Sequence, residues 1–150
     1  LDPSWVGVNI DELFTEYTGH EFTVLNDADA AGYASMNYGV GKGKDGFVVM
    51  ITIGTGLGSG AFYNGVLIPN FELGQIPYKK FKKIEKWAAA SAKEREDLSF
   101  KKWGKRFNKF LELVELIVCP DLIIVGGGTS KNWEEFSHRI KIDTEVVKAE

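Results

Sequence analysis

The apolar positions of the chain form two continuous runs that predict buried strands. Residues 47–53 (FVVMITI) are rich in β-branched side chains, and residues 120–128 (PDLIIVGGG) lead from an apolar run into three glycines. Short runs of this kind, bounded by turn residues, are typical of strands that are covered on both faces. A shorter run at 22–25 (FTVL) predicts another buried strand, and residues 144–147 (TEVV) begin one more.

Apolar side chains at steps of three and four residues predict the helices. Such steps occur over 10–17, 30–39 and 81–118, and Ser99 is a suitable N-cap within the last segment. Ser130 is expected to cap a further short helix. The Asn64-Gly65 pair predicts a hairpin turn, because both central residues of a type I′ turn need positive φ. A hairpin followed by helix, strand and helix indicates a mixed α/β sheet covered by helices.

Glycine is concentrated in one segment, residues 52–65 (TIGTGLGSGAFYNG), which holds five of the 17 glycines. Glycine lets backbone amides approach an anion closely, so this segment is a candidate phosphate-binding loop with threonine and serine hydroxyls nearby. The alternative is a tightly packed hairpin in which the glycines only relieve steric crowding. The spacing matches neither a Walker loop nor a dinucleotide-binding fingerprint.

The overall composition is that of one globular domain. The 150 residues are 44% hydrophobic and carry a formal net charge of −3. The single cysteine, Cys119, cannot form an internal disulfide, and no Cys/His cluster has zinc spacing, so no metal site is expected. No run approaches the roughly 20 apolar residues of a membrane span, and we expect a cytoplasmic protein. Because the sequence opens with Leu1 rather than Met, we expect a piece of a longer protein.

Polar side chains follow the predicted strand at 22–25. Asp27 could act there as a general base, whereas the simpler interpretation is that Asp27 or Asp29 caps the helix that follows. Glu72 lies in a loop among apolar neighbours (NFELGQI), which favours a carboxylate held in a partly apolar site. An isolated loop glutamate is otherwise usually solvated.

Basic residues gather in one part of the chain. Residues 79–109 contain 12 of the 18 Lys and Arg residues and four acidic residues. Such a charge asymmetry can attract a polyanion, although a solvated helix face explains it more commonly. No nucleic-acid-binding module matches the sequence.

Three of these segments, taken in order, resemble the ROK (repressor, open reading frame, kinase) family, and within it the polyphosphate glucokinase branch. They are residues 25–39 (LNDADAAGYASMNYG), 47–76 (FVVMITIGTGLGSGAFYNGVLIPNFELGQI) and 119–131 (CPDLIIVGGGTSK). The resemblance implies the actin-like ATPase fold of hexokinase type (ribonuclease H-like), an α/β fold. Residues 1–28 would then end the small N-terminal domain and residues 29–150 would form most of the large C-terminal domain, both incomplete.

The resemblance also implies an activity and its residues. Members of the family phosphorylate the 6-hydroxyl of hexoses such as glucose with ATP or, in this branch, polyphosphate, and they use Mg²⁺. Asp27 matches the catalytic base, Asn26 and Glu72 match sugar-binding residues, and Gln75 stands where the E-x-G-H motif of the family has a sugar-contacting histidine. The phosphate-binding segment is matched by Gly54, Thr55, Gly56 and Gly58, and the segment that binds the nucleotide or donor by Gly126, Gly127 and Gly128.

Three hypotheses follow from these observations. The first is a polyphosphate- or ATP-dependent glucokinase whose N-terminal phosphate segment lies outside this sequence, so that these residues alone do not turn over. The second, motivated by Gln75, is a sugar-binding protein of ROK type without catalysis. The third is a polyanion-binding module built on residues 79–109. The resemblance predicts glucose and a phosphoryl donor as partners, with neither nucleic acid nor membrane, and it is compatible with a homodimer.

Overall fold

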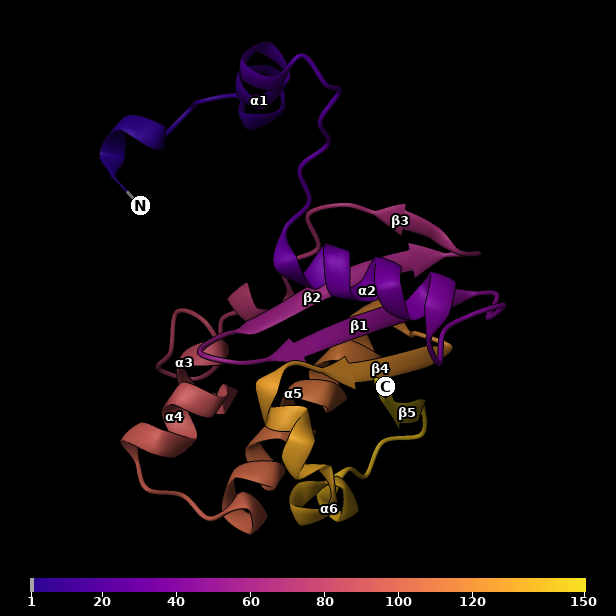
Figure 1. The fold of residues 1–150 in the computed structure, drawn as a ribbon. Coiled ribbons are helices and arrows are strands. Elements are labelled where there is room, and N and C mark those ends of the chain that lie inside the picture. Colours follow the sequence, from indigo (N-terminus) through magenta and orange to yellow (C-terminus); the bar gives the residue numbers. More distant parts are fainter. Residues whose placement is uncertain (1) are drawn as a thin grey trace.

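The computed structural model describes residues 2–150, which build one five-stranded mixed sheet with helices on both faces (Figure 1). The strands are β1 (Phe47–Ile53), β2 (Leu57–Tyr63), β3 (Val66–Ile68), β4 (Leu122–Gly126) and β5 (Glu145–Lys148). Their order in the sheet is β3-β2-β1-β4-β5, with β1, β2 and β3 antiparallel and with β4 parallel to both β1 and β5. The predicted mixed α/β sheet is therefore confirmed, including the strand at 144–147.

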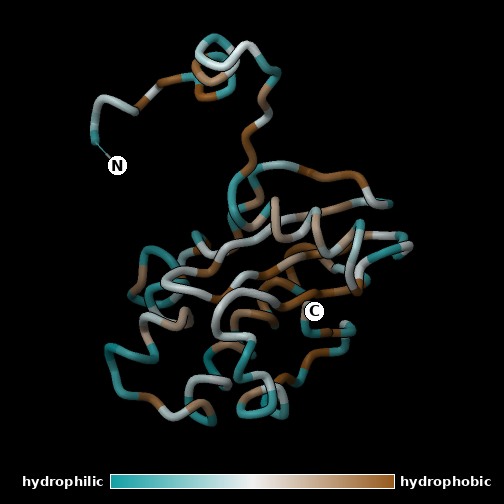
Figure 2. Tube along the Cα trace, in the orientation of Figure 1, coloured by the Kyte–Doolittle hydropathy of each residue, from teal (hydrophilic) through white to brown (hydrophobic). Residues whose placement is uncertain are grey.

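Both faces of the central strands are buried, which explains their continuous apolar composition (Figure 2). Alternate side chains of β1 point to opposite faces. Val49 and Ile51 join a large core with Trp103 and Phe107 of α5 (Phe100–Val118). On the other face, Val48, Met50 and Phe62 pack with Met36 of α2 (Asp27–Tyr38). The sheet is thus held rigidly between two helical layers.

The Asn64-Gly65 hairpin is confirmed, because both residues have positive φ (49° and 80°) between β2 and β3. The helical prediction for 81–118 is only partly correct. This segment contains α3 (Glu85–Ala88), α4 (Ala90–Arg95) and α5, and the chain turns at Ala89 and again before Ser99. Ser99 caps α5 as predicted, since its hydroxyl accepts a hydrogen bond from the amide of Lys102.

Ser130 does not cap a helix as predicted. It lies inside the 3₁₀ segment Gly128–Asn132, and its hydroxyl donates to the carbonyl of Gly127 at 2.8 Å. The helix α6 (Trp133–Phe136) that follows is only one turn long and has no side-chain cap. A second 3₁₀ segment, Ser137–Arg139, then leads toward β5.

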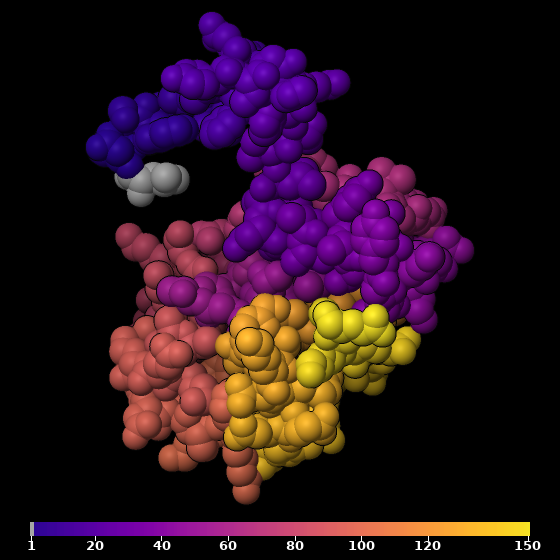
Figure 3. Space-filling model, in the orientation of Figure 1, coloured from indigo at the N-terminus to yellow at the C-terminus, as the bar shows by residue number. Residues whose placement is uncertain are grey.

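The N-terminal segment stands away from the sheet (Figures 1 and 3). It consists of the 3₁₀ turn Pro3–Trp5, helix α1 (Ile10–Thr18), which confirms the helix predicted at 10–17 and ends at left-handed Gly19, and an irregular stretch up to Asn26. The predicted strand at 22–25 is wrong. The amides of Phe22 and Val24 bond to the side chains of Thr15 and Asp11, and the apolar side chains of this stretch are 37–51% exposed.

Candidate active site

The loop between β1 and β2 has three residues, Gly54, Thr55 and Gly56, and two of them lack a side chain. Its carbonyls are anchored to α4: Gly54 accepts from the amide of Ala90 at 3.2 Å, and Thr55 accepts from the hydroxyl of Ser91 at 2.6 Å. The amide of Gly54 closes the turn on the carbonyl of Gly56. The amides of Thr55 and Gly56 donate to no acceptor within residues 2–150. Two oriented N–H groups are therefore available to an anion.

The glycines of this segment serve two different purposes. A Cβ atom on Gly60 would lie 3.1 Å from the carbonyl oxygen of Ala28, and one on Gly58 would lie 3.0 Å from its Cβ atom. These two glycines let the start of α2 rest directly on β2. A Cβ atom on Gly54 would meet nothing, and one on Gly56 would meet only the carboxylate of Glu85 at 2.6 Å. Close packing against α2 thus explains the glycines at positions 58 and 60, and the open loop explains those at positions 54 and 56.

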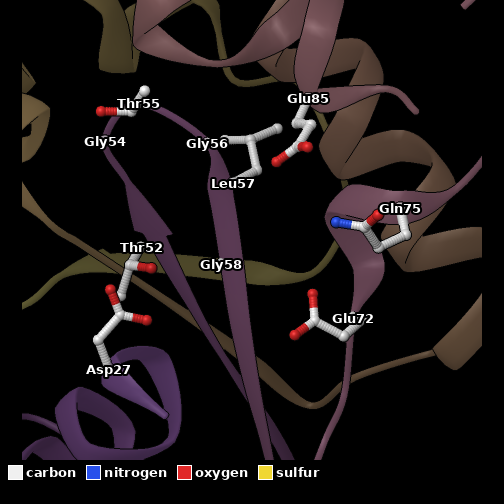
Figure 4. A pocket seen from close by; sticks show the side chains of 10 residues that line it. All are labelled: Asp27, Thr52, Gly54, Thr55, Gly56, Leu57, Gly58, Glu72, Gln75 and Glu85. Carbon is white, nitrogen blue, oxygen red and sulfur yellow. The ribbon is translucent and has the colours of Figure 1, made fainter. Parts of the chain in front are cut away.

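A hollow of about 310 Å³ lies between α2, this loop and the segment after β3 (Figure 4). The residues that line it are Asp27, Thr52, Gly54, Thr55, Gly56, Leu57, Gly58, Glu72, Gln75 and Glu85. We call this the acceptor hollow. Asp27 and Thr52 point into it from one side, and Glu72, Gln75 and Glu85 from the other. The lining contains three carboxylates and no cationic side chain, which suits a neutral ligand with many hydroxyl donors.

Each carboxylate is placed by a different element. Asp27 is the first residue of α2, directly after the N-cap Asn26. Glu72 immediately precedes the 3₁₀ turn Leu73–Gln75, which is tied to β2 because the amide of Leu73 donates to the Ser59 hydroxyl at 2.8 Å. Glu85 begins α3. The side chain of Glu72 is exposed to the hollow, contrary to the expected partly apolar setting.

Asn26 is not among the residues that line the acceptor hollow. Its side-chain oxygen Oδ1 accepts from the backbone amide of Asp29 at 2.7 Å as a helix cap, and its side-chain nitrogen Nδ2 donates to a carboxylate oxygen of Asp29 at 2.8 Å. The expected helix cap exists, but Asn26 provides it instead of either aspartate. Asp29 is 2% exposed and also lies 3.4 Å from the amide of Asn70, so it links α2 to the loop that carries Glu72.

A second hollow of about 390 Å³ adjoins the first at Gly54 and Thr55. It lies between the β1–β2 loop, α4 and the 3₁₀ segment after β4, and we call it the donor hollow. Its polar lining consists of the side chains of Thr55, Ser91, Lys93, Glu94, Thr129 and Asn132, so it contains one cation and one carboxylate. The ammonium of Lys93 lies 4.2 Å from the ring centroid of Phe100. Because the charges of Lys93 and Glu94 balance, the free amides of the loop and the neighbouring hydroxyls are what suit this hollow to an anionic ligand.

Of the three glycines predicted to bind the donor, Gly126, Gly127 and Gly128, only one lies at the donor hollow. Gly128 lines the donor hollow, whereas Gly126 and Gly127 line a different depression between α2 and the C-terminal residues. Gly127 has a φ of 83°, and a Cβ atom on it would lie 2.6 Å from the backbone of Ile53, so it serves close packing against β1.

Sequence reasoning missed Glu85, Ser91 and Lys93. All three lie in the segment 79–109, whose composition suggests only a basic helical surface. The sequence feature that could have indicated them is the run of three alanines at 88–90, with Glu85 before it and Ser91 directly after it. That run lets α3 and α4 lie close to the β1–β2 loop.

No group of His, Cys, Asp and Glu side chains in residues 2–150 is arranged to hold a metal ion by itself. In the same residues, no helix is both long and apolar enough to cross a membrane.

The class of fold is shown by comparison with solved structures. The ROK family glucokinase from Streptomyces griseus, in complex with glucose and AMPPNP, superposes on 93% of this chain with a TM-score of 0.75 at 20% identity, over 66% of its own length. This likeness confirms the actin-like ATPase fold of ROK hexokinases that the sequence leads us to expect.

The family resemblance is confirmed as well. Residues 2–70 match the family model described as ROK family. Polyphosphate glucokinase from Mycobacterium tuberculosis (strain CDC 1551 / Oshkosh) is 43% identical over 99% of this chain and 56% of its own length. The inorganic polyphosphate/ATP-glucomannokinase from Arthrobacter sp. strain KM has a TM-score of 0.90 and 40% identity, over 99% of this chain and 58% of its own. The chain thus spans about half the length of these relatives.

Proposed function

We propose that the protein containing this chain is a sugar kinase that transfers a phosphoryl group from polyphosphate or ATP to the 6-hydroxyl of glucose. One observation carries the proposal: an acidic hollow suited to hydroxyl groups and a hollow suited to anions meet at Gly54 and Thr55, in the loop whose amides of Thr55 and Gly56 are free. The relatives with at least 40% identity are named as kinases that use these substrates.

In this proposal Asp27 is the general base. The sugar hydroxyl oxygen forms a bond to the terminal phosphorus, and the bond from that phosphorus to its bridging oxygen breaks. The hydroxyl proton passes to the carboxylate of Asp27, and the donor leaves one phosphate shorter. The position of Asp27 at the start of α2, facing the β1–β2 loop, supports this role.

The opposite wall of the acceptor hollow would hold the sugar. Glu72 and Glu85 can each accept hydrogen bonds from two hydroxyls, and Gln75 can donate and accept without carrying charge. Because these groups converge on one hollow, they would orient the 6-hydroxyl toward the donor. We propose no direct sugar contact for Asn26, since its amide is already bonded to Asp29.

The donor would place its terminal phosphates on the free amides of the loop, near Lys93 and the hydroxyls of Ser91 and Thr129. Mg²⁺ usually binds one or two carboxylates together with substrate phosphates rather than an all-protein cage. The hydroxyl of Thr52, which lines the acceptor hollow beside the loop, fits that pattern as one protein ligand. When bound, the ion would neutralise charge on the transferred group.

We further propose that residues up to about 28 end a smaller domain. Large apolar side chains of that segment are exposed here, among them Trp5, Val6 and Phe14. A second domain would cover such side chains. The non-catalytic alternative based on Gln75 is not favoured, because the relatives with high identity are named as kinases.

A direct assay tests the proposed activity. The protein at its full length is incubated with glucose, Mg²⁺ and either ATP or polyphosphate, and glucose 6-phosphate is measured. We expect product with at least one donor. Glucose binding without product from either donor would contradict the proposal and support the non-catalytic alternative.

A further inference from the structure

A third hollow, of about 470 Å³, lies apart from the two described above. It is lined by Lys79, Lys80, Phe81, Trp87, Glu96 and Arg106, and it shares no lining residue with the acceptor and donor hollows. We call it the basic hollow. Glu85 and Trp87 are two positions apart in α3, so they point to opposite sides of that helix. Glu85 faces the acceptor hollow, and Trp87 faces the basic hollow.

Each cation of the basic hollow lies over an aromatic ring. The ammonium of Lys79 is 5.2 Å from the ring centroid of Tyr78 and 5.5 Å from that of Trp87. The guanidinium of Arg106 is 5.3 Å from the Trp87 ring, and the ammonium of Lys80 is 5.6 Å from the Phe81 ring. Such contacts hold long side chains in place without neutralising them. An anion that binds there loses less side-chain entropy than on mobile lysines.

The charges of the basic hollow are not balanced internally. Glu96 is the only acidic residue of its lining, and it is already shared between Arg106 and Arg95. The hydrogen bond from Arg106 lowers the pKa of the Glu96 carboxyl, so Glu96 stays ionised and committed to the arginines. Within residues 2–150, neither Lys79 nor Lys80 forms an ion pair. Two positive charges therefore remain unpaired at the rim.

The backbone presents these two lysines at the tip of a tight turn. Tyr78 and Phe81 pair with each other through two hydrogen bonds of 2.9 Å, which leaves Lys79 and Lys80 side by side between them. Lys79 adopts a left-handed φ of 52°, which costs a residue with a Cβ atom some conformational energy. The turn thus holds two like charges together in a strained conformation.

We propose that the basic hollow is an accessory binding site for a linear phosphate chain, outside the site of phosphoryl transfer. This rests on the proposed function, in which polyphosphate is a donor. Helix α4 starts at the donor hollow with Ala90 and Ser91 and ends next to Glu96, and its six residues span roughly 9 Å. A long chain whose end occupies the donor hollow could extend along α4 to the lysines.

The same geometry disfavours nucleic acid as the occupant. Bases of a single strand bind proteins by stacking on exposed aromatic faces. Here Lys79 and Arg106 already lie over the ring of Trp87, and Lys80 lies over Phe81. The basic hollow therefore offers charge rather than ring faces, which suits a chain of phosphates that carries no bases.

Kinetics of the full-length protein test the proposal. The double variant Lys79→Gln with Lys80→Gln should raise KM for long-chain polyphosphate about tenfold, the effect of losing roughly 1.4 kcal/mol of contacts. KM for tripolyphosphate, ATP and glucose should be unchanged, because these ligands do not reach the basic hollow. The matched control is Lys101→Gln with Lys102→Gln, which removes the same charge from exposed positions of α5. Equal effects of the two double variants, or no effect of the first, would overturn the proposal.

A binding measurement separates this proposal from the proposed function. Long-chain polyphosphate should change the fluorescence of Trp87, and the signal should disappear in Trp87→Phe and weaken as salt rises. It should occur even if no phosphoryl transfer is found. A fluorescence change that is unaffected by the lysine substitutions, or one produced equally by a single-stranded oligonucleotide, would contradict an accessory site for phosphate chains.

Discussion

Carboxylates set the chemistry of the acceptor hollow, and the one that no sequence pattern singles out is Glu85. It reaches the hollow from α3, and its carboxylate faces the open Cα of Gly56. Asp27 and Glu72 could be proposed from motifs because each has a recognisable setting in the sequence. Glu85 lies among lysines, so only the folding of α3 against the loop reveals its direction.

Replacing Glu85 by Gln should weaken sugar binding. A hydrogen bond to a charged group contributes about 1.5–3 kcal/mol, so we expect KM for glucose to rise roughly 10- to 100-fold. KM for the phosphoryl donor should stay within a few-fold. Steady-state kinetics with both substrates varied in turn measures the two values.

Glu134→Gln is the matched control, because Glu134 is an exposed residue of α6 outside all three hollows. A similar loss in both variants, or an unchanged KM for glucose in Glu85→Gln, would remove Glu85 from the sugar site.

At the scale of elements, the position of Asp27 depends on the contact of α2 with β2. Ala28 rests on the bare surface of Gly58, which pairs with Thr52 across the two strands. The Gly58→Ala change should therefore destabilise the protein by about 1–3 kcal/mol, because an added methyl group would collide with Thr52 and Ala28. Gly54→Ala should leave the fold intact, since open space surrounds that position.

Denaturant unfolding of both glycine variants measures this difference. Because Gly54 lies in the loop proposed to hold phosphates, its variant can lose activity while it keeps stability. Equal stability of the two variants would show that α2 does not rest on Gly58 as described.

A second tie between elements predicts a pH dependence. The side chain of Glu115 in α5 accepts hydrogen bonds from the hydroxyl and the amide of Thr144, both at 2.7 Å, just before β5. These bonds lower the pKa of Glu115 below its ordinary value of 4.5, with the hydroxyl of Thr144 as the largest cause. Because the pKa of Glu115 is lower in the folded than in the unfolded protein, ionised Glu115 stabilises the fold. This stabilisation is complete at pH values above the unfolded-state pKa and is lost as the pH falls through the folded-state pKa.

Glu115→Gln should therefore destabilise the protein at neutral pH, and the difference from the unmodified protein should shrink as the solution is acidified below about pH 4.5. Unfolding free energies measured across this range test the claim. A difference that grows toward acid pH would contradict the described bond.

The elements that could be predicted from the sequence are those fixed by local pattern and by burial within this chain. The strands β1 and β4 are almost entirely apolar because both of their faces are covered, and Asn64-Gly65 is one of the few residue pairs that the positive φ angles of this turn favour. The stretch 22–25 has the same apolar composition but has no sheet partner within residues 2–150, so its pattern predicted a strand that does not form.

The site divides in the same way. Local motifs point to Asp27, Glu72 and the open glycines as candidates, because those residues begin a helix or lie in turns. Two of the glycines, Gly58 and Gly60, are needed for packing against α2, whereas Gly54 and Gly56 lie in the open loop. No sequence motif predicts this difference, because it depends on where α2 packs. The same is true of Asn26, whose amide is bonded to a neighbouring aspartate rather than free.

For the whole molecule, the proposed domain division near residue 28 predicts different protection of two regions. Amides of 10–25 should exchange with solvent much faster than those of β1 and β4 when these 150 residues are studied alone, because the segment has few buried side chains. At the full length of the protein the same amides should gain protection. Hydrogen exchange followed by mass spectrometry compares the two. Equal protection of 10–25 in both forms would contradict a covering domain.

The most direct test of the account is the turnover number of Asp27→Asn in the full-length protein. Removal of a general base that accepts the sugar proton should lower kcat about 10²- to 10⁴-fold and leave KM for glucose within a few-fold. Asp45→Asn, at an exposed position that does not line the acceptor hollow, should keep normal turnover. A correctly folded Asp27→Asn protein with undiminished kcat would contradict phosphoryl transfer at this site.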